Sequence, residues 1–138
     1  MRSVFLAGLC LCANLYISAQ AVKVKPQLFE GIWQVTMQST GDVAGKFLPP
    51  QTNDFKIYDG EGNFRHVIYA NSKYVELSKG TIELTSDSTY TEKLDKHLAV
   101  PAAIKEGRII FRFMDPDTFL MNWSLNNLSG QEIYKRVK

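Results

Sequence analysis

Cysteine is nearly missing from this sequence, and its scarcity excludes several kinds of protein. The 138 residues include two cysteines, Cys10 and Cys12, both inside the apolar N-terminal segment. The rest of the chain can therefore form no disulfide framework, no thiolate zinc site and no cysteine nucleophile. A Gly-x-Ser-x-Gly elbow, a Gly-rich phosphate loop and a dinucleotide fingerprint are missing as well. We expect no cofactor and find no motif for nucleophilic catalysis.

An excess of charge of one sign is also missing. The 16 lysine and arginine residues are nearly balanced by 14 aspartate and glutamate residues. No basic run is long enough to form the electrostatic patch that attracts nucleic acid or an anionic membrane surface. We therefore expect neither of these partners.

Long apolar runs are absent after the N-terminal segment. The apolar run at residues 4–17 is followed by small residues that suit signal cleavage after Ala19 or Ala21. This run is shorter than the roughly 20 residues that a membrane-spanning helix needs. We interpret residues 1–19 as a cleavable export signal without a membrane span, and residues 20–138 as a single mature domain.

The lack of cysteine in residues 20–138 bears on the compartment. Secreted eukaryotic domains of this size usually carry disulfides, so the composition favours a bacterial periplasm or cell surface. Lipid attachment at Cys10 is not expected, because Leu9 stands where a small residue is needed.

What the mature sequence does contain is a succession of short stretches with period two, separated by Gly, Pro, Asn, Asp and Ser. No stretch of ten or more residues shows a convincing helical period. Strands are expected at residues 32–38, 55–58, 64–69, 74–77 (a weak or edge strand), 81–85, 89–94, 108–114, 119–125 and 132–137. About eight strands joined by consecutive hairpins predict an all-β fold, a single eight-stranded up-and-down antiparallel barrel. Such a barrel encloses packed side chains or one small ligand.

Four segments in this order resemble the calycin superfamily, the lipocalins and their relatives. More narrowly, they resemble a family of small exported lipocalin-like proteins of Gram-negative bacteria that is catalogued as a domain of unknown function. The segments are Glu30-Gly31-Ile32-Trp33-Gln34, the hairpin from Phe55-Lys56-Ile57-Tyr58-Asp59 to Gly62-Asn63-Phe64, Ser88-Thr89-Tyr90-Thr91-Glu92, and Ile133-Tyr134-Lys135-Arg136-Val137. The chain differs from secreted animal lipocalins in lacking their disulfide and any evident helix after the last strand.

The resemblance implies a structural plug at one end of the barrel, formed by Gly31, Trp33 and Arg136. In lipocalins the first-strand Trp closes the barrel and a basic residue of the last strand lies across it. A cation–π contact of this kind is worth about 0.5–2 kcal/mol, depending on desolvation. The implied role is fold closure rather than ligand chemistry.

Glu92 is the strongest candidate for a functional side chain. Thr91, Lys93 and Asp95 mark the solvent face of its strand, which turns Tyr90 and Glu92 toward the interior. An inward carboxylate must find a partner or become neutral. We expect a hydrogen bond or salt bridge to an arginine or tyrosine, with Arg112, Arg136, Arg65 and His66 as candidate partners. A purely structural ion pair and a ligand-facing role both remain open.

Further candidates follow from the strand phases. His66 lies in phase with Phe64 and Ile68, and a single histidine can hold haem iron, but the spacing of the two histidines does not fit a metal site. Aromatic residues on two adjacent strands could line an apolar cavity or fill a solid core. The expected cavity lining comprises Tyr90, Glu92, His66, Arg112, Phe113, Met121 and Trp123.

These observations predict an exported lipocalin-like barrel that binds a small apolar or amphipathic molecule. A second hypothesis is a non-enzymatic module with a solid barrel whose loops bind another envelope protein. A third is an enzyme that uses Glu92 and Tyr90 as an interior acid–base pair. Because one fold serves many functions, the strands alone do not choose among them.

Overall fold

The computed structural model of the chain describes residues 25–40, 46–98 and 101–138. The expected export signal at residues 1–19 lies outside these residues and stays a prediction. Within the described part, no helix is long and apolar enough to cross a membrane.

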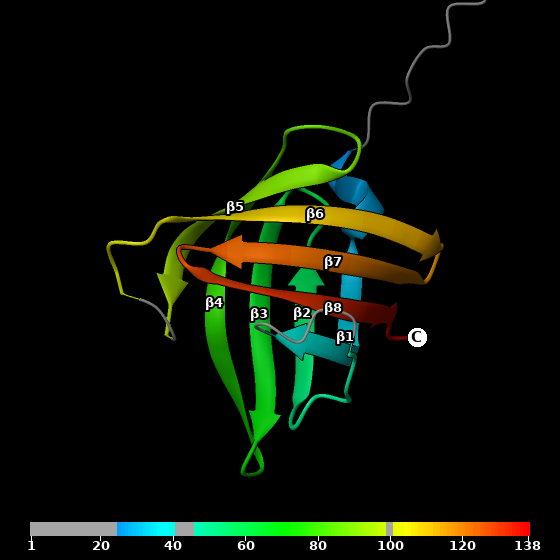
Figure 1. Ribbon diagram of the computed structural model, residues 1–138, viewed down its shortest axis with the longest axis vertical. Helices are drawn as coiled ribbons and strands as arrows, with labels where there is room; N and C mark the ends of the chain where they lie inside the picture. The colour runs from blue at the N-terminus through cyan, green and yellow to red at the C-terminus, as the bar shows by residue number, and fades with distance from the viewer. Residues whose placement is uncertain (1–24, 41–45, 99–100) are drawn as a thin grey trace, which may run out of the picture.

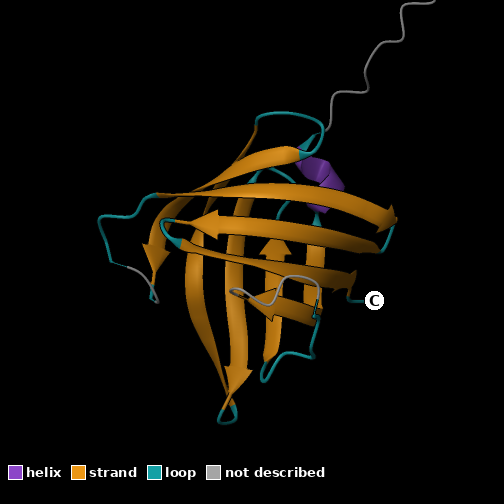
Figure 2. Ribbon diagram, in the orientation of Figure 1, coloured by secondary structure: helices purple, strands orange, loops and turns teal. Residues whose placement is uncertain are grey.

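Eight antiparallel strands form a closed barrel in which each strand pairs with its neighbours in the sequence and β8 returns to β1 (Figure 1). A short 3-10 helix, η1, precedes β1 at one end of the barrel (Figure 2). The predicted all-β, up-and-down architecture is confirmed. The elements are η1 Pro26–Phe29, β1 Gly31–Thr40, β2 Asn53–Tyr58, β3 Asn63–Ala70, β4 Lys73–Leu84, β5 Thr89–His97, β6 Glu106–Asp115, β7 Thr118–Leu125 and β8 Leu128–Arg136.

The strand predicted at residues 74–77 and the strand predicted at 81–85 are in fact one strand, β4. The sequence Ser78-Lys79-Gly80 resembles a turn, but Gly80 is buried in the middle of the strand. A Cβ atom at Gly80 would collide with the backbone oxygen of Lys93 on β5, and the register of the two strands shifts beside it. This glycine therefore permits a close approach of two backbones at a bulge.

The hairpin turns at one end of the barrel use residues with positive φ. Asn71 and Ser72, with φ values of 52° and 60°, connect β3 to β4, and Asn126, with φ of 56°, begins the turn between β7 and β8. Asparagine tolerates this conformation better than most residues. The connection between these strands is consequently short, because Leu125 already pairs with Leu128, and β8 begins before the strand expected at residues 132–137.

Packed aromatic rings fill the other end of the barrel. Phe29, supplied by η1, lies at the centre of this layer, with its ring centroid 4.9 Å from that of Phe111 and 5.7 Å from that of Phe119. The ring centroids of Trp33 and Phe119 are 4.8 Å apart in an edge-to-face arrangement. All four of these side chains are fully or almost fully buried. The sequence reasoning did not foresee the contribution of η1.

The closure of this end depends on Trp33. Its indole nitrogen donates a 2.6 Å hydrogen bond to the backbone oxygen of Phe29, and the guanidinium carbon of Arg136 lies 4.2 Å from the centroid of its ring. Arg136 also donates a hydrogen bond to the backbone oxygen of Glu30. Gly31 adopts φ of +127°, and a Cβ atom there would lie 2.7 Å from the Arg136 side chain. The three residues thus have the arrangement that the lipocalin resemblance implies, and we call this the plugged end.

Replacing Trp33 with alanine should lower the free energy of unfolding by about 3–5 kcal/mol, because a buried aromatic side chain is lost and a cavity remains. Urea denaturation measures the loss. Tyr74→Ala is the matched control, since Tyr74 is 73% exposed, and its loss should stay within about 1 kcal/mol. Equal effects of the two substitutions would contradict the assignment of Trp33 as the plug.

Candidate functional site

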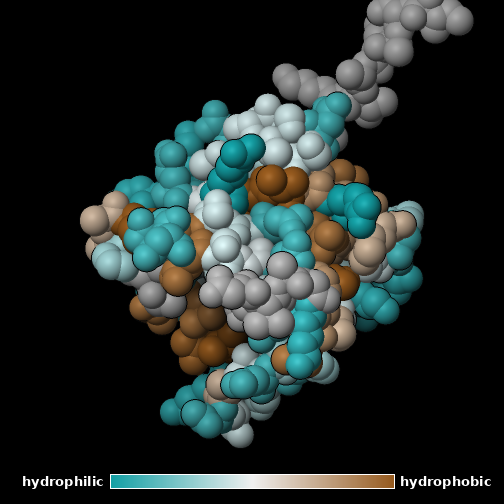
Figure 3. Space-filling view, in the orientation of Figure 1, coloured by the Kyte–Doolittle hydropathy of each residue, from teal (hydrophilic) through white to brown (hydrophobic). Residues whose placement is uncertain are grey.

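A cavity of about 220 Å³ occupies the half of the barrel away from the plugged end. Its lining includes Leu128, which begins β8 and is 51% exposed, so the cavity reaches the surface beside the β7–β8 turn. Figure 3 shows hydrophobic residues gathered in a recessed area of this face, next to the lower part of β4. We call the half of the barrel that holds the cavity the open end. The lining residues are Lys56, His66, Leu77, Ser78, Glu92, Leu94, His97, Gly107, Ile109, Met121, Trp123, Ser124, Leu125, Leu128 and Glu132.

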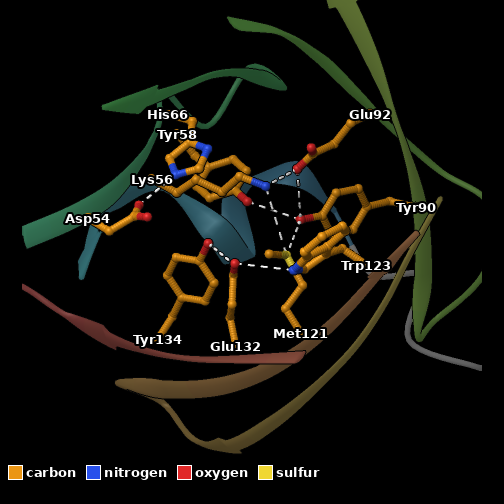
Figure 4. Close-up of polar contacts among 10 residues, drawn as sticks. All are labelled: Asp54, Lys56, Tyr58, His66, Tyr90, Glu92, Met121, Trp123, Glu132 and Tyr134. Carbon is orange, nitrogen blue, oxygen red and sulfur yellow. Dashed lines mark hydrogen bonds and ion pairs between the residues drawn. The ribbon is translucent and has the colours of Figure 1, made fainter. Parts of the chain in front are cut away.

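An ion pair between Lys56 and Glu92 lies at the inner side of the cavity (Figure 4). Lys56 projects inward from β2 and Glu92 from β5, and they are 3% and 8% exposed. Burial by itself lowers the pKa of Lys56, but the neighbouring Glu92 carboxylate, together with Tyr58 and Glu132, more than offsets this, and the net pKa is raised. Lys56 is therefore a protonated, paired cation at neutral pH.

Two tyrosines lie directly below this ion pair, toward the plugged end. The hydroxyl groups of Tyr58 and Tyr90 are 3.0 Å apart, and the Tyr90 hydroxyl donates to Glu92 over 3.4 Å. Burial raises the pKa of Tyr58 to about 12 and also raises that of Tyr90. Both phenols therefore stay protonated at neutral pH. They connect the ion pair to the aromatic layer of the plugged end.

A second polar cluster is centred on Glu132 of β8 (Figure 4). Its carboxylate accepts a 3.1 Å hydrogen bond from the indole nitrogen of Trp123 and a 2.6 Å hydrogen bond from the hydroxyl of Tyr134. Burial raises the pKa of Glu132, although the Tyr134 hydrogen bond and the more distant Lys56 oppose the shift. Glu132 is thus a carboxylate whose hydrogen-bond partners are both neutral.

The two histidines, His66 and His97, also line the cavity. The Nε2 atom of His66 lies 2.5 Å from a carboxylate oxygen of Asp54. Burial, followed by the proximity of His66, lowers the pKa of His97. Within the described residues, no group of three or more His, Cys, Asp or Glu side chains is arranged to hold a metal ion.

Four of the seven predicted lining residues do line the cavity: Glu92, His66, Met121 and Trp123. Tyr90 is fully buried beneath them, and Phe113 packs against Trp33 in the aromatic layer. The prediction for Arg112 is wrong. Arg112 is exposed, because the buried Ile109 and Phe111 fix the opposite phase for the inward side of β6.

The expected partner of Glu92 was an arginine or a tyrosine. Tyr90 is such a partner, but the main one is Lys56, which the sequence reasoning missed because its neighbours Phe55 and Ile57 are the apolar residues of β2. Glu132 was missed as well. The sequence does contain a signal for Glu132. Alternate residues of a strand point to the same face, so an inward Arg136 implies that Glu132, four residues earlier on β8, also points inward.

The Lys56–Glu92 pair should behave as one unit in stability measurements. Lys56→Met leaves a buried carboxylate without its cation and should cost about 3–5 kcal/mol. Adding Glu92→Gln should recover much of that loss, because both charges are then gone. Urea denaturation of the single and double variants gives the coupling. Additive costs would contradict a mutually dependent pair, and the exposed Lys93–Glu83 pair is the control, whose loss should matter far less.

Glu132 should make stability fall as pH rises. Its pKa is higher in the folded chain than its usual value of 4.5, so between these two values the folded state holds more protons than the unfolded state. The free energy of unfolding then decreases with increasing pH in that interval. Glu132→Gln removes this contribution. The stability of the variant relative to the wild type should therefore increase as the pH rises above 4.5, and a pH-independent difference would refute the assignment.

Comparisons with known proteins place this barrel in a family. Residues 28–138 match the model of a family described as "Domain of unknown function (DUF4488)", and no curated protein matches the chain. Among solved structures, it is similar to the redesigned β-barrel b11L5F_LGL, with 10% identity, a TM-score of 0.53, and coverage of 86% of this chain and 99% of the other. It is also similar to a fluorescence-activating β-barrel designed de novo, with 14% identity, a TM-score of 0.50, and coverage of 81% of this chain and 96% of the other.

A third structure is a redesigned β-barrel, mFAP1, bound to DFHBI, with 14% identity, a TM-score of 0.47, and coverage of 80% of this chain and 97% of the other. At such identities the likeness to solved structures concerns the fold alone, which in coarse outline is that of a lipocalin-like barrel. The family match extends from η1 to the last residue and includes every strand of the barrel. The chain belongs to the DUF4488 family.

Proposed function

We propose that this barrel binds one small amphipathic molecule in the cavity at its open end. The observation that carries the proposal is the division of the interior into two halves. Packed rings fill the plugged end, whereas the other half holds a cavity that reaches solvent. A cavity with apolar walls and a few convergent polar groups is the usual form of a small-molecule site.

The walls of the cavity suit an apolar body. Leucine and isoleucine side chains from β4, β5, β6, β7 and β8 form much of the surface, together with the Trp123 ring. These aliphatic residues are Leu77, Leu94, Ile109, Leu125 and Leu128. Burying apolar surface against them contributes roughly 25 cal/mol per Å².

The size of the cavity limits the ligand. An apolar cavity of about 150 Å³ accepts benzene, so the 220 Å³ here suits a molecule of about one ring with a short side chain. The cavity is smaller than the roughly 300–1,000 Å³ of typical drug-sized sites. A long-chain lipid would have to extend beyond the mouth.

Polar groups at the inner side would orient such a molecule. Lys56 and Glu92 satisfy one another, and Glu132 and His66 add hydrogen-bonding atoms at the same level. A ligand with one polar end would therefore enter with that end first and leave its apolar body between the leucines.

The alternative hypotheses receive less support from the arrangement of these residues. An enzyme that uses Glu92 and Tyr90 needs both groups beside the ligand, but the Tyr90 hydroxyl is buried against Tyr58, Glu92 and Met121. An interaction module with a solid barrel needs no cavity. Export, with a role in the periplasm or at the cell surface, is part of our proposal, and its support is the sequence of residues 1–19.

The two tryptophans of the chain provide the test. Trp123 lines the cavity, whereas Trp33 is fully buried in the plugged end. Titration with 2-phenylethanol should shift the NMR signal of the Trp123 indole N–H in a saturable way and leave that of Trp33 unchanged. Equal shifts of both signals, or no saturable shift, would overturn the proposal.

A blocking variant makes the same test specific to the cavity. Gly107 lines the cavity, and a Cβ atom there meets no atom closer than 3.4 Å, so Gly107→Val should fold and fill part of the space. Its affinity for 2-phenylethanol should fall by about ten-fold or more, a change of roughly 1.4 kcal/mol. Arg108→Val, at the neighbouring exposed position of β6, is the control and should keep the affinity within about two-fold.

A further inference from the structure

We infer that the cavity selects molecules that carry a protonated amine over carboxylic acids of the same size, and that Glu132 receives the ammonium group. This inference rests on the proposed function and adds the chemical class of the ligand. It comes from the charges inside the barrel, from the partners of each charge, and from the position of the Trp123 ring.

Carboxyl groups outnumber permanent cations in the polar interior. Asp54, Glu92 and Glu132 come from β2, β5 and β8, whereas the basic groups that line the cavity are one lysine, Lys56, and two histidines, His66 and His97. The lowered pKa of His97, caused by burial and by His66, keeps its imidazole neutral at neutral pH. Lys56 pairs with Glu92 and His66 with Asp54, whereas the hydrogen bonds of Glu132 come from an indole and a phenol. A cationic ligand would complete this balance, and an anionic ligand would worsen it.

Lys56 is poorly placed to receive an anion. Its ammonium group forms the ion pair with Glu92, and its other neighbours are the sulfur of Met121 at 3.9 Å and the ring of Phe64, whose centroid lies 5.3 Å away. A ligand carboxylate would have to displace Glu92 and leave that side chain buried without its cation. Such a displacement is strongly unfavourable.

Glu132, unlike Lys56, is not paired with a group of opposite charge among the described residues. Its two hydrogen bonds come from an indole N–H and a phenol, neither of which brings a positive charge. A carboxylate has about four acceptor positions, so lone pairs are left for a ligand. Burial raises the pKa of Glu132 against the opposing effects of Tyr134, Lys56 and His66, which means that its charge is incompletely compensated. An ammonium group in contact with it would supply that compensation.

The indole ring of Trp123 adds a second element of cation recognition. Trp123 lies across the strand pair from Gly130, where a Cβ atom would stand 2.7 Å from the ring. The missing side chain at Gly130 lets the ring lie against β8, and its N–H reaches Glu132 in this position. An ammonium group beside Glu132 would therefore also lie near an aromatic surface, where a cation–π contact adds to the attraction.

Three probes with the same phenyl body test the inference: 2-phenylethylamine, 2-phenylethanol and 3-phenylpropionate. Calorimetric titration at neutral pH should show the amine binding at least about ten-fold more tightly than the carboxylate, with the alcohol between them. A carboxylate that binds as tightly as the amine, or more tightly, would overturn the inference. If the alcohol binds in the cavity and the amine has no advantage, the ligand class is wrong and the proposed function stands. If none of the three binds, both fail.

A substitution assigns the preference to one residue. Glu132→Gln keeps the shape of the side chain and should lower the affinity for the amine by about ten-fold while changing that for the alcohol by less than about two-fold. Glu61→Gln, in the exposed turn between β2 and β3, is the control for loss of one negative charge. An unchanged ratio of amine to alcohol affinity in Glu132→Gln would overturn the role of Glu132. The ranking of the three probes on the wild-type chain tests the ligand class even if this variant does not fold.

Discussion

The pairing of β1 with both of its neighbours is the constraint on which the rest of this structure depends. Trp33 stands opposite Lys56 on β2 and opposite Arg136 on β8. Because side chains alternate along a strand, this register turns Trp33, Lys56 and Arg136 to the same side of the sheet, toward the barrel axis. The same phase brings Tyr134 and Glu132 inward on β8. The plug, the lysine of the buried ion pair and the second carboxylate therefore follow from one alignment of three strands.

The ion pair divides the interior into two halves. On one side of the pair aromatic rings fill the barrel, and on the other side lies the cavity. Charged groups at such a boundary are costly to desolvate, and buried pairs of this kind often add little to stability. The tyrosine hydroxyls beside the pair help to satisfy it, and the described buried side chains leave no nitrogen or oxygen without a partner. The pair lies where the packed half of the interior meets the cavity.

Alternation made much of the fold and part of the site predictable. The solvent-facing Thr91 and Lys93 showed that Glu92 points inward, and Trp33 on the first strand indicated which end of the barrel is closed. Lys56 was missed because an inward lysine between two apolar residues breaks the expected pattern, and only the cross-strand register reveals it. Gly80 was misread for a related reason: a turn glycine and a glycine at a close backbone contact look alike in one sequence. The prediction for Arg112 was wrong because this residue was chosen as a partner for Glu92 by its charge. The buried Ile109 and Phe111 set the phase of that strand and turn Arg112 outward.

The closed meander also has a consequence for the order of folding. Seven of the eight strand pairs join consecutive strands, so they can form from hairpins between neighbouring segments of the sequence. The pairing of β1 with β8 joins the two ends of the barrel sequence, and contacts between such distant segments are slow to form. Until it forms, both terminal strands present unpaired backbone edges that can pair with another copy of the chain. The pairing of β1 with β8, expected to form last, is therefore also the place where misassembly would begin.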